Sequence, residues 1–438
     1  MLKNIEIKGL FGRFNYKLNF EDKNIVILTG PNGFGKSTIL QIVDAIANNR
    51  FFYLLKVEFE ELYFEFIDNE NLNKIVSIIR EEKRLLINKT DIKLDKSFNE
   101  VNKMMTDFPW ISQIDSNTFE DRRFEKYYTF DELFLRYLYS KGNDIYINSQ
   151  NRINEIKKEI KKIEKILKET KALFGEIVLI SEQRLIRKQN INKRRNEEEV
   201  GDVIVNLPEE LKKEISKVSE KYSNIANKLD STYPNRLFRA EKGLNSEAEF
   251  NDLLNKSKEK FQKLEEYDLV NMSNIEDSKY KSEYATALKI YFDDFSKKYE
   301  VFESLIKKFD LFTNIINSRF NFKKVKISKT HGLEIIDKSD SNKTIDLQQL
   351  SSGEKQEIIL FYNLIFKTKD NLLLLIDEPE ISLHIVWQKK FLEDLLKITE
   401  NSKIKVILAT HSPQIISNHW DLQIDLGEQY QSDELNSK

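Results

Sequence analysis

Residues 30–38 read GPNGFGKST and follow the apolar run IVIL at residues 25–28. The spacing GxxxxGK followed by Ser is that of a phosphate-binding loop. Glycines at positions 30, 33 and 35 permit turns that point consecutive backbone N–H groups at phosphate oxygens. Apolar residues at helical spacing follow the loop, so a chance glycine-rich turn explains the pattern poorly.

Each position of this loop has a predicted task in holding a triphosphate. Lys36 is placed to pair with β- and γ-phosphate oxygens, and the Ser37 hydroxyl is placed to ligate Mg²⁺. The N-terminus of the following helix adds a partial positive charge. The residues predicted to contact the nucleotide here are Asn32, Gly33, Gly35, Lys36, Ser37 and Thr38.

A second block, LSSGEKQ at residues 350–356, precedes another helix-compatible run. Ser351 and Ser352 can cap that helix, and Gly353 permits close backbone approach. The next element is LLLLIDEPE at residues 372–380, an apolar strand that ends in adjacent carboxylates. Asp377 is the predicted Mg²⁺ ligand, and Glu378 is the predicted group that orients and polarises the attacking water.

A further apolar strand is predicted at residues 403–409, followed by Thr410 and His411. A lone histidine in a loop is usually structural. The position of His411, at the end of the strand after the two carboxylates, favours a functional role instead. We therefore predict that His411 contacts the γ-phosphate through a hydrogen bond.

Composition limits the classes of function. The 438 residues can bury a large core, and the net charge of −2 provides no global basic field for nucleic acid, although local basic patches are compatible with it. The absence of Cys excludes disulfides, thiol nucleophiles and Cys-based zinc sites, and it suits a reducing cytoplasm. Apolar runs are far shorter than about 18 residues, so we expect neither export nor a membrane association.

The rest of the chain reads as strands and helices around these motifs. Residues 2–20 predict a hairpin, residues 54–67 and 84–88 predict further antiparallel strands, and residues 176–180 predict a strand that returns to the sheet. Residues 280–318 predict a long packed helix, and strand periodicity resumes after residue 322.

Two features of these segments leave alternatives open. Phe11, Arg13 and Phe14 lie where an adenine or phosphate contact could arise, but ordinary hairpin packing with a solvated arginine explains them more simply. Apolar residues at alternating intervals of three and four form seams at residues 153–167 and 211–229. The seams fit an antiparallel coiled-coil hairpin or one face of a helical bundle.

Without a long linker or a repeat, we expect one head interrupted by insertions. Its N-lobe, with the phosphate-binding loop and a β subdomain, spans residues 1–95. A helical insertion at 96–173, a strand returning to the head at 174–190 and a helical or coiled-coil insertion at 191–319 follow. The C-lobe spans residues 320–438.

The ordered set GPNGFGKST, LSSGEKQ, LLLLIDEPE, ISLH and THS resembles the ATP-binding-cassette (ABC) ATPases, on the SMC, Rad50 and RecF side rather than the transporter side. The resemblance covers roughly residues 1–50 and 320–438. It implies an α/β fold, in which an ABC-ATPase head with a mixed P-loop sheet and an antiparallel β subdomain carries helical or short coiled-coil insertions. It also implies that the nucleotide is ATP, hydrolysed with Mg²⁺.

The same resemblance implies a homodimer in which two copies sandwich ATP, and it allows higher oligomers of such dimers. In that arrangement the signature residues of one subunit face the γ-phosphate held by Lys36 of the other. The signature residues are Ser351, Ser352, Gly353 and Glu354.

Three further residues take roles by this resemblance. Ser382 and His384 occupy the stretch where the D-loop of the family crosses the dimer interface. Gln183, after the returning strand, is the candidate for the glutamine that contacts Mg²⁺ and the attacking water.

The chain resembles the OLD-type ATPases of bacterial defence systems more than it resembles Rad50. It carries DEPEISLH close to LSSGE and a His-Trp-Asp at residues 419–421. Too few residues follow residue 412 for a Toprim nuclease domain. The resemblance therefore implies a stand-alone ATPase subunit of an anti-phage system such as PARIS or Septu, a sensor or scaffold whose effector nuclease is a separate chain.

Two other classes remain open. One is a DNA-repair or DNA-tethering ATPase of the Rad50 or RecF kind, which the missing zinc-hook Cys pair and the near-neutral charge disfavour. The other is a transporter ATPase subunit, which the long helical insertions disfavour.

Overall fold

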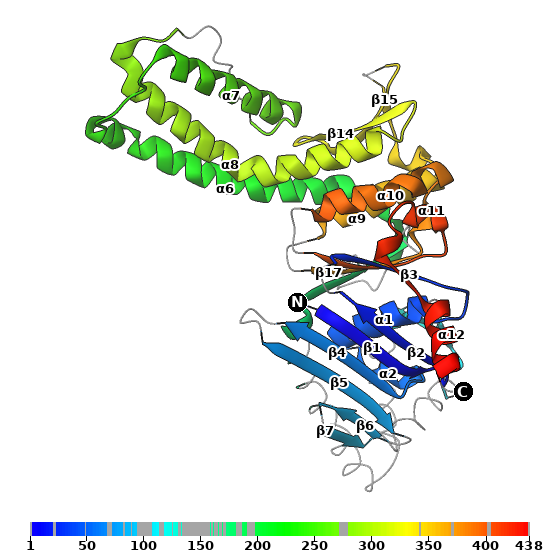
Figure 1. Ribbon diagram of the computed structural model, residues 1–438. Helices are drawn as coiled ribbons and strands as arrows, with labels where there is room; N and C mark the ends of the chain where they lie inside the picture. The colour runs from blue at the N-terminus through cyan, green and yellow to red at the C-terminus, as the bar shows by residue number, and fades with distance from the viewer. Residues whose placement is uncertain are drawn as a thin grey trace, which may run out of the picture. The chain divides into compact units, whose positions relative to one another are not determined.

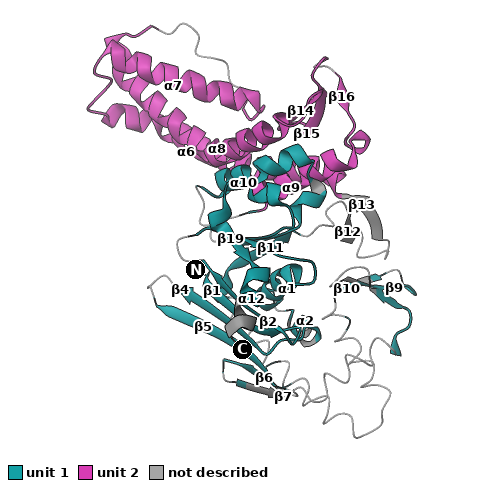
Figure 2. Ribbon diagram, turned by 45° about the vertical axis from the view of Figure 1, so that its right-hand side comes forward, with its two compact units in different colours: residues 1–184, 188–200, 368–438 teal, residues 185–187, 201–367 magenta. Residues whose placement is uncertain are grey.

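The computed structural model describes most of the chain, which falls into two compact units (Figure 2). Unit 1 comprises residues 1–184, 188–200 and 368–438, and unit 2 comprises residues 185–187 and 201–367. The described residues are 2–20, 23–48, 50–67, 72–81, 84–88, 90–93, 107–113, 118–124, 126–129, 133, 158, 161, 165, 169, 172–180, 186–190, 198–270, 279–340, 343–368, 372–400 and 404–436.

A five-stranded sheet with the order β11-β17-β18-β3-β19 forms the centre of unit 1. Each pairing between these described strands is parallel. Strands buried on both faces read as continuous apolar runs, which explains IVIL in β3 and LLLLI in β17. The bounds are β3 (Ile25–Thr29), β11 (Glu176–Ile180), β17 (Leu372–Asp377), β18 (Lys405–Ala409) and β19 (Gln423–Asp425).

The sheet order decides where the site lies. Asp377 pairs with Ala409, and Ala409 pairs with Leu28, so the carboxyl ends of β17, β18 and β3 meet at one edge. Asp425, at the end of β19, pairs with Thr29 just before the phosphate-binding loop. In open parallel sheets this edge is where ligands bind.

A six-stranded antiparallel sheet completes unit 1, with the order β2-β1-β4-β5-β6-β7 (Figure 1). The predicted hairpin at residues 2–20 is confirmed by the antiparallel pairing of β1 and β2. The bounds are β1 (Leu2–Leu10), β2 (Phe14–Asn19), β4 (Glu61–Ile67), β5 (Asn73–Glu81), β6 (Arg84–Ile87) and β7 (Thr90–Lys93).

The expected strand character of residues 54–67 is wrong in its first part. Helix α2 (Phe51–Lys56) precedes β4, because Leu54 is fully buried and the Tyr53 hydroxyl donates to Gln41 Oε1 of helix α1 at 2.5 Å. A short apolar run does not distinguish a buried helical turn from a strand.

Helix α1 begins directly after the phosphate-binding loop. Helix α1 packs against β11, β17 and β18, and its buried side chains join those of β1 and β4 in one core. The helices are α1 (Lys36–Ala47), α2, η3 (Pro379–Ser382), α10 (Ile385–Thr399), α11 (Pro413–Ile416), η4 (Trp420–Leu422) and α12 (Leu426–Asn436).

Residues 96–173 were expected to be helical, but three short strands form an antiparallel sheet there. Phe119 and Asp121 are buried and Glu120 between them is half-buried, which is the alternation of a strand. The strands are β8 (Ile111–Gln113), β9 (Thr118–Asp121) and β10 (Lys126–Thr129). A separate pair is formed by β12 (Ile186–Asn190) and β13 (Glu198–Asp202).

Unit 2 is dominated by long helices around α8, which confirms the predicted helix at residues 280–318. Its aromatic stripe is core, as expected: Phe295, Phe302, Phe309 and Phe312 are buried. The elements are α6 (Val203–Arg239), α7 (Glu247–Glu266), η1 (Ser282–Tyr284), α8 (Ala285–Asn317), β14 (Lys323–Ser328), β15 (Gly332–Asp337), β16 (Thr344–Ile345), η2 (Leu347–Gln349) and α9 (Ser352–Phe366).

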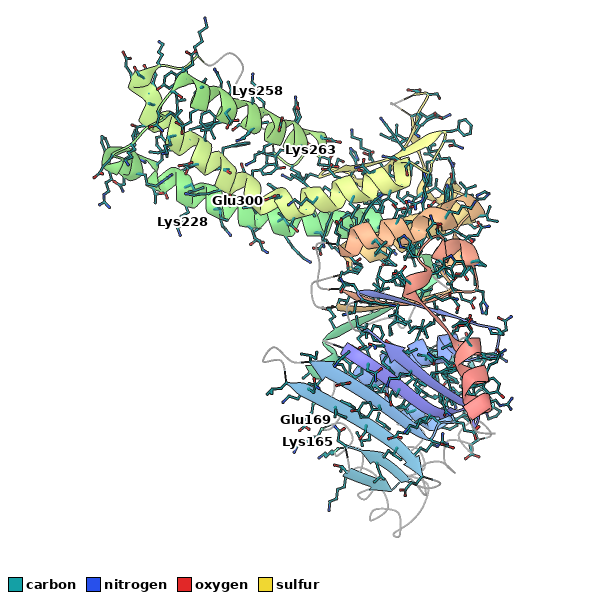
Figure 3. All side chains as sticks on the ribbon, viewed as in Figure 1. Lys165, Glu169, Lys228, Lys258, Lys263 and Glu300 are labelled. Atoms are coloured by element: carbon teal, nitrogen blue, oxygen red, sulfur yellow. The ribbon has the colours of Figure 1, made fainter. Side chains whose placement is uncertain are left out.

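The seam at residues 211–229 lies on α6 and packs against α8. Tyr222 meets Phe302 with ring centroids 5.2 Å apart, while exposed positions such as Lys228 and Glu300 carry charge (Figure 3). Helix α7 also lies along α8, where Lys263 donates to Asp310 at 2.8 Å. The apolar residues of the seam at 153–167 lie outside the described residues, so a hairpin between the two seams stays a prediction.

The predicted α/β class is confirmed by the parallel sheet, the antiparallel sheet and the helical unit 2. Among the residues that the structure describes, the helices are too short or too polar to cross a bilayer.

Candidate functional site

The phosphate-binding loop joins β3 to α1 in a conformation that requires glycine. Gly30, Gly33 and Gly35 have φ of 135°, 84° and 88°. A Cβ on Gly35 would also lie 2.8 Å from Leu10 Cδ2. Gly35 caps α1 without a side-chain hydrogen bond, and the first turn of α1 contains no acidic residue. Such a helix start suits an anion.

Lys36 is buried at the first position of α1 and folds back over the loop. Its Nζ donates to the carbonyl oxygens of Gly30 at 2.8 Å and Pro31 at 3.2 Å. Burial lowers the pKa of Lys36, and the carboxylates of Glu378 and Asp377 oppose that change. The loop therefore surrounds a positively chargeable nitrogen with backbone groups.

Ser37 and Asp377 meet across the sheet edge, although 340 positions separate them in the chain. The Ser37 hydroxyl donates to Asp377 Oδ1 at 2.9 Å. A hydroxyl oxygen and a carboxylate oxygen side by side are hard ligands of the kind that Mg²⁺ prefers. The residues present thus fit a divalent cation, and the predicted ligand pair is brought together.

Glu378 has a strained backbone at the end of β17. Its φ of 44° and ψ of 59° lie in the left-handed region, which costs a non-glycine residue about 1–3 kcal/mol. Its amide donates to the Ala409 carbonyl at 3.0 Å, which ties the turn to β18. Such strain concentrates at functional sites, which fits the role predicted for this residue.

The His411 ring lies between the Lys36 ammonium group and the Glu378 carboxylate. Its Nδ1 is 3.3 Å from Lys36 Nζ, and its Nε2 is 3.6 Å from Glu378 Oε1. The histidine predicted to contact phosphate is therefore beside both the loop lysine and the predicted water-orienting carboxylate.

Sequence reasoning missed two carboxylates at this edge. Glu380 accepts hydrogen bonds from the Thr410 hydroxyl at 2.7 Å and the His411 amide at 2.6 Å. Asp425 accepts from the Thr29 hydroxyl at 3.1 Å and from the Gly427 amide at 2.8 Å. Glu380 stands within DEPE and could have been noticed there, whereas no local pattern marks Asp425.

The aromatics at the first hairpin pack together, as the simpler alternative expected. Phe14 is buried, with ring centroids 5.0 Å from Phe34 of the loop and 5.2 Å from Tyr430 of α12. The Tyr16 hydroxyl donates to the Phe34 carbonyl at 2.8 Å. Arg13 is exposed, with its guanidinium carbon 5.9 Å from the centre of the Phe14 ring. This cluster anchors the loop.

The signature block begins α9 in unit 2. Ser351 is the N-cap, and Ser352 is the first helical residue. The Ser351 hydroxyl accepts from the Glu354 amide at 3.3 Å, and Glu354 accepts from the Ser351 amide at 2.8 Å, a complete capping box. Lys323 also donates to Glu354 at 2.9 Å. Burial raises the pKa of Glu354, but the hydrogen bonds from Lys323 and Ser351 outweigh it and hold that pKa below 4.5.

The other predicted site residues are placed as follows. His384 is the N-cap of α10, where its Nδ1 accepts from the Val386 amide at 3.4 Å. The Ser382 side chain and Gln183 lie outside the described residues, so their roles stay predictions. Asn32 and Thr38 lie in the loop and the first turn of α1, where Asn32 is exposed and Thr38 is half-buried.

Comparisons with known proteins bear on the whole chain. Solved structures similar to it include an SMC head bound to the C-terminal winged-helix domain of ScpA (TM-score 0.36, 13% identity, covering 95% of this chain and 91% of that chain). A second is an Smc head domain with an extended coiled coil, bound to the C-terminal domain of ScpA, from Pyrococcus furiosus (TM-score 0.35, 14% identity, covering 95% of this chain and 91% of that chain). A third is an SMC head domain from Thermotoga maritima (TM-score 0.33, 11% identity, covering 95% of this chain and 90% of that chain). Comparison with curated proteins gave no significant match. The family model described as AAA ATPase domain matches residues 1–416, so the chain belongs to this family of ATPases.

Proposed function

We propose that this chain binds ATP with Mg²⁺ at the edge of the parallel sheet in unit 1 and hydrolyses it. The observation that carries the proposal is the 2.9 Å hydrogen bond between Ser37 and Asp377, which brings the two predicted cation ligands together. Lys36, Glu378 and His411 lie around this pair. Phosphoryl transfer requires ligands for a cation, a positive charge in the phosphate-binding loop and a carboxylate that can orient water, and these groups lie together here.

The roles follow from chemistry and position. Lys36 and the first amides of α1 hold phosphate oxygens, and Glu378 orients the attacking water. His411, placed between Lys36 and Glu378, donates to the γ-phosphate. Bound Mg²⁺ supplies neutralisation of the negative charge on the phosphate oxygens.

The test compares two lysines of unit 1. Lys36→Ala removes a charge-assisted contact with phosphate, so ATP affinity should fall by about 2–4 kcal/mol, or roughly 30- to 1,000-fold. Lys74→Ala, an exposed position on β5, should leave affinity and turnover unchanged. Binding is measured by titration and turnover by phosphate release, with and without a chelator. Equal affinity and turnover in the two variants would refute the site.

We further infer that a second copy of the chain completes the site, because nothing among the described residues requires glycine at position 353. A Cβ there would meet no described atom within 4 Å, and its backbone is helical. Glycine in a helix costs about 0.5–1 kcal/mol relative to Ala. Close approach of a partner's phosphate accounts for this cost, as the resemblance to ABC ATPases implies.

Mixing two defective variants tests this dimer. Gly353→Asp places a carboxylate beside the partner's nucleotide, so it should bind ATP but not hydrolyse it. Mixed with Lys36→Ala, it forms heterodimers in which one composite site carries both changes and the other carries neither, so turnover should return. Thr344→Asp adds the same charge elsewhere in unit 2 as a control. Heterodimers that form without regaining turnover would contradict the model.

We also propose that the ATPase serves as the sensor or scaffold subunit of an anti-phage system with a separate effector nuclease. The support is the resemblance of DEPEISLH and LSSGE to the OLD-type ATPases. The chain should be purified together with the product of the neighbouring gene, and their masses measured with and without ATP. A neighbouring nuclease held in an ATP-dependent complex supports this role, whereas a recombination protein there favours the DNA-repair alternative.

A further inference from the structure

We propose that Glu380 is a positioning residue that holds His411 in the ATPase site. Glu380 lies in η3, two residues after Glu378, and His411 lies in the turn after β18. The inference rests on the proposed function, since it assigns a task to a residue of the same site. In this proposal Glu380 acts through the position of His411, whose amide donates to it.

Two consecutive groups of the β18 turn donate to one oxygen of Glu380. The Thr410 hydroxyl lies 2.7 Å from Oε1, and the His411 amide lies 2.6 Å from the same atom. The Thr410 hydroxyl also accepts from the Ser412 amide at 3.0 Å, and Thr410 is fully buried. The backbone on both sides of the histidine is therefore fixed to the turn that carries Glu378.

A second bridge joins the same two turns through Gln388 of α10. Its Nε2 donates to the carbonyls of Glu380 at 3.3 Å and Leu383 at 3.1 Å, while its Oε1 accepts from the Ser412 hydroxyl at 2.7 Å. Through this bridge and the Glu380 carboxylate, hydrogen bonds join the turn after β17 to the turn after β18 at both ends of the His411 segment.

The second oxygen of Glu380 argues for more than a structural link. Oε2 is buried and has no hydrogen-bond partner among the described residues. A fold that needed only to join two turns could do so with a smaller acceptor and without an unpaired buried oxygen. A task for Glu380 explains why this unpaired oxygen is kept. Glu380 holds the segment of His411, whose Nδ1 lies 3.3 Å from Lys36 Nζ and whose Nε2 lies 3.6 Å from Glu378 Oε1.

A double-mutant cycle between Glu380 and His411 tests the inference. Glu380→Ala should lower kcat for ATP about 10- to 100-fold, as expected when a contacting group is misplaced, and should change ATP affinity less than about twofold. In the His411→Ala background the same change should lower kcat by less than about twofold, because there is no ring left to position. Glu380→Gln keeps an oxygen for both donors and should stay within about threefold of the wild type.

Controls separate positioning from loss of fold. Glu393→Ala, an exposed carboxylate on α10, should leave kcat unchanged. Thr410→Val removes one of the two donors and serves as a second variant if Glu380→Ala melts at a lower temperature. A wild-type chain without ATPase activity overturns the proposed function and this assignment with it. An active wild type in which Glu380→Ala lowers kcat equally in both backgrounds overturns the assignment alone.

Discussion

The buried ion pair between Arg319 and Glu357 anchors the signature helix α9 within unit 2. Arg319 Nε lies 2.7 Å from Glu357 Oε1, and the two side chains are 2% and 0% exposed. The guanidinium also lies 4.5 Å from the centre of the Phe361 ring, and its Nη1 donates to the Ile315 carbonyl at 3.1 Å. We predict that Glu357→Gln, which removes one charge and keeps the shape, strongly destabilises unit 2.

The size of the destabilisation expected for Glu357→Gln follows from the burial of the Arg319–Glu357 pair. Removing one partner of a buried pair leaves the other charge uncompensated and costs about 3–5 kcal/mol. The ratio of folded to unfolded unit 2 should therefore fall by roughly two to four orders of magnitude. With a urea m-value of about 1–3 kcal/mol/M, the unfolding midpoint should move down by at least about 1 M.

Two probes follow the two units separately. All three tryptophans, Trp110, Trp387 and Trp420, lie in unit 1, so their fluorescence reports on unit 1. Among the described residues the three longest helices, α6, α7 and α8, all lie in unit 2, so far-UV circular dichroism is weighted toward unit 2. The dichroism midpoint should fall in Glu357→Gln, whereas the fluorescence midpoint should change less.

Two comparisons make the result decisive. Replacing both partners by apolar residues, in Arg319→Met with Glu357→Leu, should restore most of the stability, because neither charge then remains buried. Asp252→Asn breaks a surface ion pair in which the side chains of Asp252 and Lys256 are 60% and 65% exposed. This change should lower the free energy of unfolding by less than about 1 kcal/mol. A dichroism midpoint that moves no further in Glu357→Gln than in Asp252→Asn would refute the reasoning.

Three further outcomes are expected. Glu378→Gln should keep nucleotide binding while turnover falls about 10²- to 10⁴-fold, measured by phosphate release; turnover near the wild-type rate would leave Glu378 without its proposed role. In Gly332→Ala a Cβ would lie 2.1 Å from a carbonyl oxygen of α6 at a φ of 72°, so thermal unfolding should reveal a loss of about 1–3 kcal/mol or more, unlike Gly353→Ala. Lys323→Met removes a donor that holds the pKa of Glu354 below 4.5. The variant should therefore have a lower free energy of unfolding than the wild type above pH 4.5. This difference should disappear as the pH falls, because Glu354 is then protonated in both proteins. A difference in stability that persists in acid would argue against this ion pair.

Several elements could be predicted because their signals are local. The unbroken apolar run at residues 372–376 predicted a strand that ends in carboxylates, and β17 (Leu372–Asp377) confirms it. The helix at Ser352 follows from its capping residues. Residues 54–56 were misassigned because a short apolar run has no decisive period, and contacts with α1 selected the helix.

Contiguous patterns, a phosphate-binding loop and an apolar strand that ends in carboxylates, were enough to identify the chemical groups at the ends of strands. Which of those ends meet depends on how the strands are ordered in the folded sheet. The order β17-β18-β3-β19 places Glu380 against Thr410 and Asp425 against Thr29, a residue 396 positions away. Hydrogen bonds between loops depend on strand order and register, which arise from packing of the whole core and leave no periodic trace in the chain.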